Sequence, residues 1–388
     1  MNEKLSYILN HLGEDRDDYL QAVVPPVFQT SNFAYPDVAT LRERLQRELE
    51  VPFYTRGYNP TTALLRKKLA ALDGAEDALV FGSGSAAISA AVISSVKAGD
   101  HVVCVTGAYS WANKLLNKLL VRFGVTTTMV DGRDINQVSE AFRENTTVLY
   151  LESPTSALFE LQDMEALTKM AHSKGVTTIC DNTYATPLFQ QPIRLGIDLV
   201  VQSASKYLGG HSDIVAGVVT GNAERIGKIY NEEFMTLGAV LSPNDCWLMI
   251  RGLRTLPLRL ERSGANAMAL ATALDGHPKI ERVNHPGLTS HPQYELGKKQ
   301  MTGYSGLFSV LVRAENVSQI ESFCNHLKCF VLATSWGGHE SLVFPQCAFS
   351  ESPNYMKSTL PWNLVRFYCG LEESGELIDD VIQALNQV

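Results

Sequence analysis

The feature that most constrains the fold of this chain is an alternation of short β-rich runs with helical segments between residues 75 and 222. The runs favour strands, and the segments between them place apolar residues at helical spacing. Strands are predicted at residues 78–81, 101–105, 126–130, 147–152, 176–180, 199–202 and 215–220, and helices at 86–97, 110–122, 134–143 and 161–173. This alternation predicts an α/β fold with a large, mostly parallel sheet, which binds ligands beyond the carboxyl ends of its strands.

Two further regions flank the alternating part. Residues 1–60 are irregular except for an amphipathic helix after Asp37. Asn59-Pro60 then begins another helix, because asparagine caps helices well and proline suits the first helical position. After a helix-rich stretch, strands are predicted at 307–312 and 364–369, and helices at 317–328 and from 374. We therefore predict an N-terminal arm and helix (1–60), a ligand-binding domain (61–250) and a smaller C-terminal α+β domain (251–388).

Composition narrows the class of protein and of partner. The 388 residues are 45% hydrophobic, which is ample for a large core, and their net charge is −8. A mildly acidic chain without a Lys/Arg block argues against nucleic acid or an anionic membrane as the main partner. No run approaches the ~20 apolar residues that cross a bilayer, and the N-terminus lacks the apolar core of a signal peptide. Seven scattered cysteines in apolar segments are typical of free buried thiols, so we expect a cytoplasmic protein.

A glycine-serine turn, Gly82-Ser83-Gly84-Ser85, leads from a predicted strand into a helix. Its backbone N–H groups and the positive end of the helix suit an anion such as phosphate. The turn also fits the dinucleotide pattern G-x-G-x-x-A, although the acidic residue Asp100 precedes the next strand instead of ending it. A purely structural turn is the third interpretation.

Three charged side chains accompany this turn. Asp181 follows the predicted strand 176–180, which would hold its carboxylate at the ligand edge; a helix cap is the alternative. Lys206 follows another buried strand, where burial would lower the pKa of its amine and make it nucleophilic, unless it is a solvated loop residue. Arg366 lies within an apolar strand and suits either a substrate carboxylate or a structural ion pair.

Together these four features match what pyridoxal phosphate needs from a protein. The phosphate would bind to the turn, and Asp181 would keep the pyridine nitrogen protonated so that the ring can accept electrons. Lys206 would bind the cofactor covalently and then transfer protons. Arg366 would hold the carboxylate of an amino acid and so fix its orientation.

At these residues the chain resembles the Cys/Met-metabolism enzymes that use pyridoxal phosphate. This family includes cystathionine γ-synthase, cystathionine β- and γ-lyases, methionine γ-lyase and the acylhomoserine sulfhydrylases. The resemblance runs from about Pro25 to the C-terminus. The segments that carry it are Tyr54–Thr61 (YTRGYNPT), Ser203–Asp213 (SASKYLGGHSD), Arg251–Leu256 (RGLRTL) and Ser335–Leu342 (SWGGHESL).

The resemblance implies a type I aminotransferase-like fold and a role for each matching residue. Lys206 would bind the cofactor covalently, Asp181 would face its ring nitrogen, and Tyr109 would stack on its ring and activate the substrate amine. The residues that would bind the phosphate are Gly84, Ser85, Ser203 and Ser205, joined by Tyr54 and Arg56 from a neighbouring subunit. Those that would bind the substrate are Ser335, Trp336 and Arg366. Shared sites imply at least a dimer, and the family is usually a homotetramer.

Several positions depart from the family pattern. Ser85 replaces the usual methionine, although its backbone N–H can still serve. Ser156-Ala157 stands where Asn-Pro is usual, which puts the placement of the substrate in question. Ser110-Trp111 follows Tyr109 where methionine γ-lyases carry a cysteine, and this counts against that activity.

Two positions favour β-elimination. Thr334 stands where γ-synthases and γ-lyases typically carry a glutamate, and Trp336 gives the SWGG form associated with bacterial cystathionine β-lyases, unless it only packs in the core. We therefore predict β-elimination of cystathionine to homocysteine, pyruvate and ammonia. The alternatives are γ-elimination, γ-replacement on an O-acylhomoserine, an aminotransferase and a non-catalytic protein of the same fold. No metal is expected, because Cys324, His326 and Cys329 lack ligand spacing.

Overall fold

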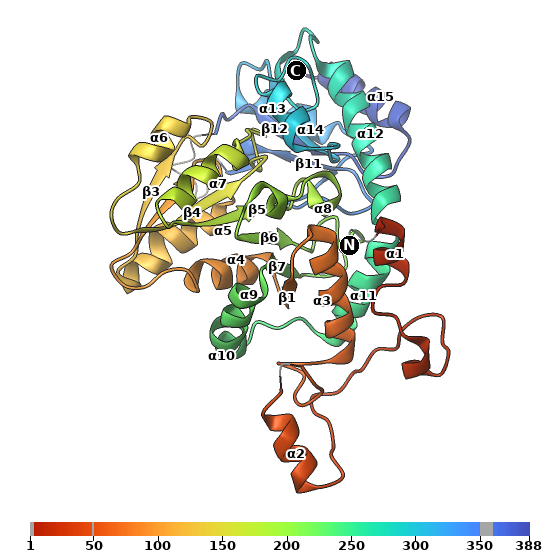
Figure 1. Cartoon of the computed structure of the whole chain (residues 1–388). Helices are drawn as coiled ribbons and strands as arrows, with labels where there is room; N and C mark the ends of the chain where they lie inside the picture. The colour runs from red at the N-terminus through yellow and green to blue at the C-terminus, as the bar shows by residue number, and fades with distance from the viewer. Residues whose placement is uncertain (1–3, 49, 350–359) are drawn as a thin grey trace.

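A seven-stranded sheet is built from the alternating part of the chain, with strand order β1-β7-β6-β5-β4-β2-β3 (Figure 1). The computed structural model describes residues 4–48, 50–349 and 360–388. The strands of this sheet are β1 (Asp77–Phe81), β2 (His101–Val105), β3 (Thr126–Val130), β4 (Thr146–Glu152), β5 (Thr177–Asp181), β6 (Leu199–Ser203) and β7 (Gly217–Gly221). Strands β3, β2, β4, β5 and β6 are adjacent in this order and pair in parallel. Strand β7 is antiparallel to both of its neighbours, β1 and β6. The predicted α/β class with a mostly parallel sheet is confirmed.

Helices connect these strands as the periodicity predicts. The helices of this region are α3 (Pro60–Asp73), α4 (Gly84–Ile93), α5 (Ser110–Lys114), α6 (Ile135–Glu140), α7 (Met164–Ser173), α8 (Thr186–Phe189), α9 (Ala223–Ile229), α10 (Met235–Leu237) and α11 (Pro243–Arg254), with the short turns η4 (Pro192–Leu195) and η5 (Tyr230–Phe234). Helix α3 begins where predicted, because the Asn59 side chain accepts a hydrogen bond from the N–H of Thr61 at 2.9 Å. It ends at Gly74, whose φ of +68° is left-handed.

One predicted helix, over residues 110–122, is divided into three pieces in the structure. Helix α5 is followed by the π-turn η2 (Leu115–Leu119) and the 3-10 turn η3 (Leu120–Phe123). Five residues span only slightly more than one turn of a π-helix, so the wider turn lets Leu115 and Leu120 both face the core, where both are buried.

A second sheet is formed by the C-terminal part of the chain, with order β10-β11-β12-β9-β8. Its strands are β8 (Ile280–Asn284), β9 (Leu307–Val312), β10 (Val331–Leu332), β11 (Leu342–Pro345) and β12 (Leu364–Tyr368). Only β9 and β12 are predicted from sequence. The pattern of β8 is broken by exposed Glu281 and Arg282, β10 is two exposed residues, and β11 ends in a proline, so these strands form through pairing with longer neighbours.

The helices in the C-terminal part of the chain are α12 (Leu256–Leu274), α13 (Tyr294–Gln300), α14 (Val317–Asn325) and α15 (Ser374–Leu385), together with the turn η6 (Gln346–Phe349). Helix α12 packs against α15, β8 and β9, whereas α11, directly before it, packs against α3. The chain therefore passes from the packing of the first sheet to that of the second between α11 and α12.

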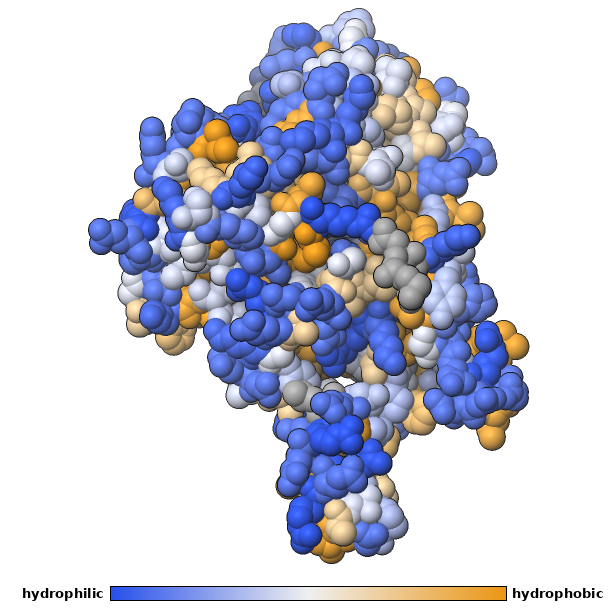
Figure 2. Space-filling view, in the orientation of Figure 1, coloured by the Kyte–Doolittle hydropathy of each residue, from blue (hydrophilic) through white to orange (hydrophobic). Residues whose placement is uncertain are grey.

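The N-terminal arm packs against the body of the molecule at its beginning and projects from it around residues 38–45 (Figure 1). It contains α1 (Leu5–Asn10), η1 (Arg16–Tyr19) and α2 (Val38–Leu45), and α2 has the predicted cap, since Asp37 accepts a hydrogen bond from Thr40 N at 2.7 Å. The apolar side chains Val38, Leu41 and Leu45 of α2 are exposed. Figure 2 shows a mostly hydrophilic face of the molecule with scattered hydrophobic side chains, some of them at the end of the arm.

The cysteines have the state that the sequence predicts. All seven are free thiols, and all but the partly buried Cys329 are buried. In the described part of the chain, no helix combines the length and the apolar character that a bilayer-spanning segment needs.

Candidate active site

The candidate site lies where the parallel strands β4, β5 and β6 end side by side. Glu152 is the last residue of β4 and pairs in register with Asp181, the last residue of β5. Both carboxylates are buried, with 4% and 7% of their surface exposed. Carboxyl ends of parallel strands share one edge of a sheet, so the topology brings these groups together as the position of Asp181 predicts.

Thr183 connects the end of β5 to the end of β6. Its backbone N–H donates to a carboxylate oxygen of Asp181 at 2.9 Å, and its hydroxyl also bonds that oxygen. The same hydroxyl accepts from the N–H of Ser203 at 2.9 Å. Burial raises the pKa of Asp181, and the Thr183 hydrogen bonds and the charge of Lys206 oppose this rise.

Lys206 lies in the turn after β6, and its amine reaches across to the second half of the chain. The Nζ atom donates a hydrogen bond to the Ser335 hydroxyl and lies 5.7 Å from the centre of the Trp336 ring. Burial, together with the charge of Arg366, lowers the pKa of Lys206 to about 8, although Asp181 acts in the opposite direction. The amine is therefore far closer to its neutral, nucleophilic form at physiological pH than an ordinary lysine.

The segment that presents Ser335 is held in an unusual conformation. Ser335 has a φ of +82°, in the left-handed region that favours glycine. A Cβ atom on Gly337 would lie 2.7 Å from the backbone nitrogen of Tyr207, so only glycine lets this segment approach the lysine turn so closely. Trp336 is buried and packs against the Tyr207 ring, with 5.3 Å between ring centres.

The predicted phosphate turn lies directly against the end of β6. Helix α4 begins at Gly84, and the Ser83 hydroxyl caps it by accepting from the N–H of Ala86 at 3.0 Å. A Cβ atom on Gly84 would lie 2.8 Å from the Ser203 Cβ, so the turn and the strand end meet without room for a side chain. Ser85 is exposed in the first turn of α4, whose N–H groups have no partner within the helix.

Ser205 and Arg366 complete the arrangement around Lys206. The Ser205 hydroxyl accepts a hydrogen bond from the N–H of Ala216 at 2.9 Å. Arg366 lies on β12, with its guanidinium 5.8 Å from the centre of the Phe344 ring and a nitrogen 3.4 Å from the carbonyl oxygen of Ser156.

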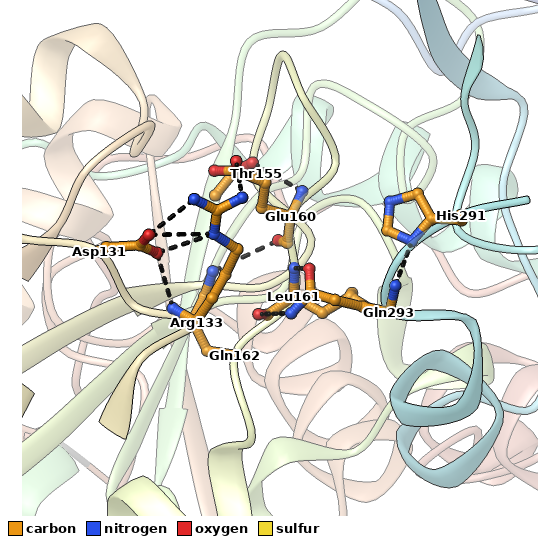
Figure 3. Close-up of polar contacts among 8 residues, drawn as sticks. All are labelled: Asp131, Arg133, Thr155, Glu160, Leu161, Gln162, His291 and Gln293. Carbon is orange, nitrogen blue, oxygen red and sulfur yellow. Dashed lines mark hydrogen bonds and ion pairs between the residues drawn. The ribbon is translucent and has the colours of Figure 1, made fainter. Parts of the chain in front are cut away.

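The loop after β4 is held from both sides (Figure 3). On one side, Arg133 binds Asp131 and forms an ion pair with Glu160 at 2.9 Å. On the other, the Gln293 side chain accepts from the N–H of Leu161 at 2.8 Å and donates to its carbonyl at 2.6 Å. This loop, residues 153–162, carries Ser156 towards Arg366 and is therefore fixed by both halves of the molecule.

Glu152 is a site residue that the sequence analysis overlooks. Its carboxylate accepts a hydrogen bond from the N–H of Tyr109 at 2.7 Å and another from the Ser156 hydroxyl. Burial and the charge of Asp181 raise its pKa. The signal that could have found it is the one used for Asp181: an acidic residue at the end of a buried strand.

Tyr54 and Arg56 are not brought to this site by the single chain. The Arg56 guanidinium lies 5.2 Å from the centre of the Tyr54 ring, and Tyr54 forms a β-bridge with Asn32 inside the arm. Their expected contribution from a neighbouring subunit stays a prediction. Within residues 4–48, 50–349 and 360–388, no group of three or more His, Cys, Asp and Glu side chains is placed to hold a metal ion.

The residues at this edge fit pyridoxal phosphate by their chemistry. Lys206 is an amine with a lowered pKa for the aldehyde, and Asp181 is a buried carboxylate for a protonated ring nitrogen. Helix α4 begins at Gly84 directly beside Ser203, and the N–H groups of a first helical turn suit an anion. Fold and donor set together define an enzyme that works through pyridoxal phosphate on a type I aminotransferase-like fold. More narrowly, the chain belongs to the Cys/Met metabolism PLP-dependent enzyme family, whose model matches residues 7–386.

Known proteins similar to this chain include several activities. It is 39% identical to an L-methionine gamma-lyase of Fusobacterium nucleatum over 94% of this chain and 93% of that protein. It is 36% identical to a cystathionine beta-lyase of Lactococcus lactis over 97% of each. Its fold matches the crystal structure of metB from Corynebacterium glutamicum with a TM-score of 0.93 and 34% identity, over 99% of this chain and 98% of that one.

Proposed function

We propose that this protein is a pyridoxal-phosphate-dependent carbon–sulfur lyase whose main reaction is β-elimination of cystathionine to homocysteine, pyruvate and ammonia. The observation that carries the proposal is the environment of the Lys206 amine. This amine donates a hydrogen bond to the Ser335 hydroxyl. Burial and the charge of Arg366 lower its pKa to about 8, whereas the charge of Asp181 acts in the opposite direction.

The proposed roles around the cofactor follow from the donor groups. When bound, pyridoxal phosphate supplies an electron sink for negative charge at the substrate Cα. Lys206 would bind its aldehyde, Asp181 would keep its ring nitrogen protonated, and Tyr109 would cover its ring. The residues that would hold its phosphate are Gly84, Ser85, Ser203 and Ser205.

The same amine would then move the protons of the reaction. Once the substrate amine has displaced it, Lys206 Nζ would take the proton from Cα and later give it to the departing sulfur, which a pKa near 8 suits in both directions. Ser335 would orient the amine and, with Arg366, hold the substrate carboxylate. That hold decides which bond to Cα breaks, because it sets the rotation of the substrate.

Two neighbours of Ser335 support β-elimination over the γ-reaction. Thr334 offers no carboxylate to a distal substrate ammonium, and Trp336 lies against the reacting lysine as well as against Tyr207. The second candidate is γ-elimination, which the similarity to the Fusobacterium L-methionine gamma-lyase favours. It would require a second proton abstraction, at Cβ, before the γ-substituent leaves.

The experiment that separates the two candidates is product analysis. The purified protein is given cystathionine, cysteine, methionine and O-acetylhomoserine in turn, and both pyruvate and 2-oxobutyrate are measured. Pyruvate from cystathionine is the expected result. If 2-oxobutyrate dominates, the reaction is γ-elimination and the assignment to β-elimination fails.

We also propose a homotetramer with shared active sites, in the cytoplasm. The exposed apolar side chains of α2 and the position of Tyr54 and Arg56 in the N-terminal arm support contact between subunits. Seven free thiols support a reducing compartment.

A further inference from the structure

Glu152 combines deep burial with a position between two functional segments. It ends β4 with 4% of its surface exposed and stands in register beside a second buried carboxylate, Asp181. Burying one carboxylate next to another opposes folding, because each loses its contact with water and like charges repel each other. Because burial of Glu152 is unfavourable for folding, the hydrogen bonds that its carboxylate oxygens accept need a functional explanation.

The two carboxylate oxygens of Glu152 hold different parts of the chain. One accepts the backbone N–H of Tyr109 at 2.7 Å, at the residue directly before α5. The other accepts the hydroxyl of Ser156, in the loop after β4. These partners lie 43 residues before and 4 residues after Glu152 in sequence, so a single side chain joins two connections of the sheet.

One of the two partners is next to the proposed cofactor site, and the other is next to the proposed binding site of the substrate carboxylate. Tyr109 is the residue expected to cover the cofactor ring. Ser156 offers its carbonyl oxygen to Arg366 at 3.4 Å, and Arg366 is the residue expected to hold the substrate carboxylate. A shift of Glu152 would therefore move both the Tyr109 ring over the cofactor and the Arg366 side chain that would bind the substrate carboxylate.

We infer that Glu152 is a positioning residue of this site, which sets the ring-covering Tyr109 and the Ser156–Arg366 contact in one common geometry. The inference rests on the proposed function and deepens it. It also gives a role to the serine at position 156, where asparagine is usual in the family, because its hydroxyl donates a hydrogen bond to Glu152.

The test compares three variants with a matched control. Glu152→Ala removes both contacts, Ser156→Ala removes only the loop contact, and Glu152→Gln keeps an acceptor for the Tyr109 N–H and a polar group for Ser156. The control is Asp380→Ala, which removes another buried carboxylate that accepts backbone N–H groups, those of Lys328 and Cys329 at 2.8 Å, on α15. For each protein we measure KM and kcat, the Kd for pyridoxal phosphate, the visible circular dichroism of the bound cofactor, and Tm.

The expected results separate positioning from stability. Ser156→Ala raises KM about tenfold, as loss of one buried hydrogen bond predicts, and leaves the dichroism unchanged. Glu152→Ala raises KM at least as much and also reduces the dichroism, because the ring cover has moved. Glu152→Gln restores both towards the wild type. Asp380→Ala lowers Tm but leaves KM and the dichroism as they were.

A Glu152→Ala protein with wild-type KM and dichroism overturns the inference, whatever its Tm. If that variant does not fold, Glu152→Asp is used, since its carboxylate is withdrawn by one carbon and should shift KM and dichroism in the same direction. Cofactor affinity and dichroism need no substrate, and KM is taken with whichever substrate the wild type cleaves. Formation of 2-oxobutyrate would thus refute the β-lyase proposal without touching the inference about Glu152.

Discussion

Lys206 becomes reactive through its surroundings and not through its own chemistry. Burial and the positive charge of Arg366 make the protonated amine costly, and they outweigh the attraction of Asp181, so its pKa is lowered to about 8. A lysine with this pKa is protonated below pH 8 and neutral above it. Only the neutral amine can attack an aldehyde.

This difference predicts how fast the cofactor-free protein takes up pyridoxal phosphate. Between pH 7 and pH 9 the rate of covalent binding should rise about tenfold, following the neutral fraction of Lys206, and then level off. Stopped-flow absorbance measures it, and Lys206→Ala, which should show neither covalent binding nor turnover, is the control. A rate that keeps rising tenfold per pH unit beyond pH 9 would mean that the amine has an ordinary pKa.

Arg366 is expected to act on substrate binding. Arg366→Ala should raise KM by an amount equivalent to about 2–4 kcal/mol, because the substrate carboxylate loses a charged partner. Cofactor affinity should change little. Steady-state kinetics with cystathionine check this, Arg366→Lys serves as the charge-preserving control, and an unchanged KM would show that another group holds the carboxylate.

How much of the site the sequence predicts depends on what brings each residue to it. Asp181 and Lys206 follow buried strands, and parallel topology alone carries both to one edge of the sheet. Ser335 meets Lys206 across 129 residues, through the packing of two separate sheets, and no periodicity in the sequence encodes that contact. Only the family resemblance predicts the role of Ser335, and the sequence does not single out Glu152, because an acidic residue at a strand end also suits solvent.

At the scale of elements, the loop of residues 153–162 depends on contacts with the C-terminal half of the chain. Gln293 bonds both the N–H and the carbonyl of Leu161 from 132 residues away, and Ser309 bonds the carbonyl of Ala157 at 2.7 Å. Sequence alone predicts neither contact. It predicts the strands of the first sheet together with β9 and β12, but not β8, β10 and β11, whose apolar patterns are interrupted or very short.

The two hydrogen bonds of Gln293 make a prediction about this loop. Gln293→Ala should raise KM severalfold and destabilise the protein by about 1–3 kcal/mol, with unchanged affinity for pyridoxal phosphate. Gln383→Ala is the matched control, since Gln383 also donates to a backbone carbonyl, that of His326 at 2.8 Å, but on the surface of the C-terminal half. Equal KM values for the two variants would show that the loop does not need Gln293.

At the scale of the whole molecule, the N-terminal arm is the part whose exposed apolar side chains are not covered by the rest of the same chain. Tyr54 and Arg56 contact each other within the arm, and α2 leaves Val38 and Leu45 exposed, with 68% and 57% of their surface accessible. Both observations are explained if the arm of one subunit completes the site of another, as the resemblance predicts.

Complementation between inactive variants tests this arrangement. Lys206→Ala and Arg56→Ala should each be nearly inactive alone, but co-expression should restore activity, because a mixed dimer can combine an intact lysine with an intact arm in one site. Separately purified proteins mixed without exchange of subunits are the control. No recovery in a verified mixed oligomer would contradict shared sites.

The left-handed backbone at Ser335 limits how the substrate range of this protein could be altered in the laboratory. Glycine and asparagine tolerate its φ of +82°, but neither carries the hydroxyl that Lys206 contacts. A saturation library at this codon should therefore return almost only the parental serine, whereas exposed Thr334 beside it is open to randomisation. Engineering a new substrate specificity into this protein would therefore have to keep Ser335 and change the residues around it.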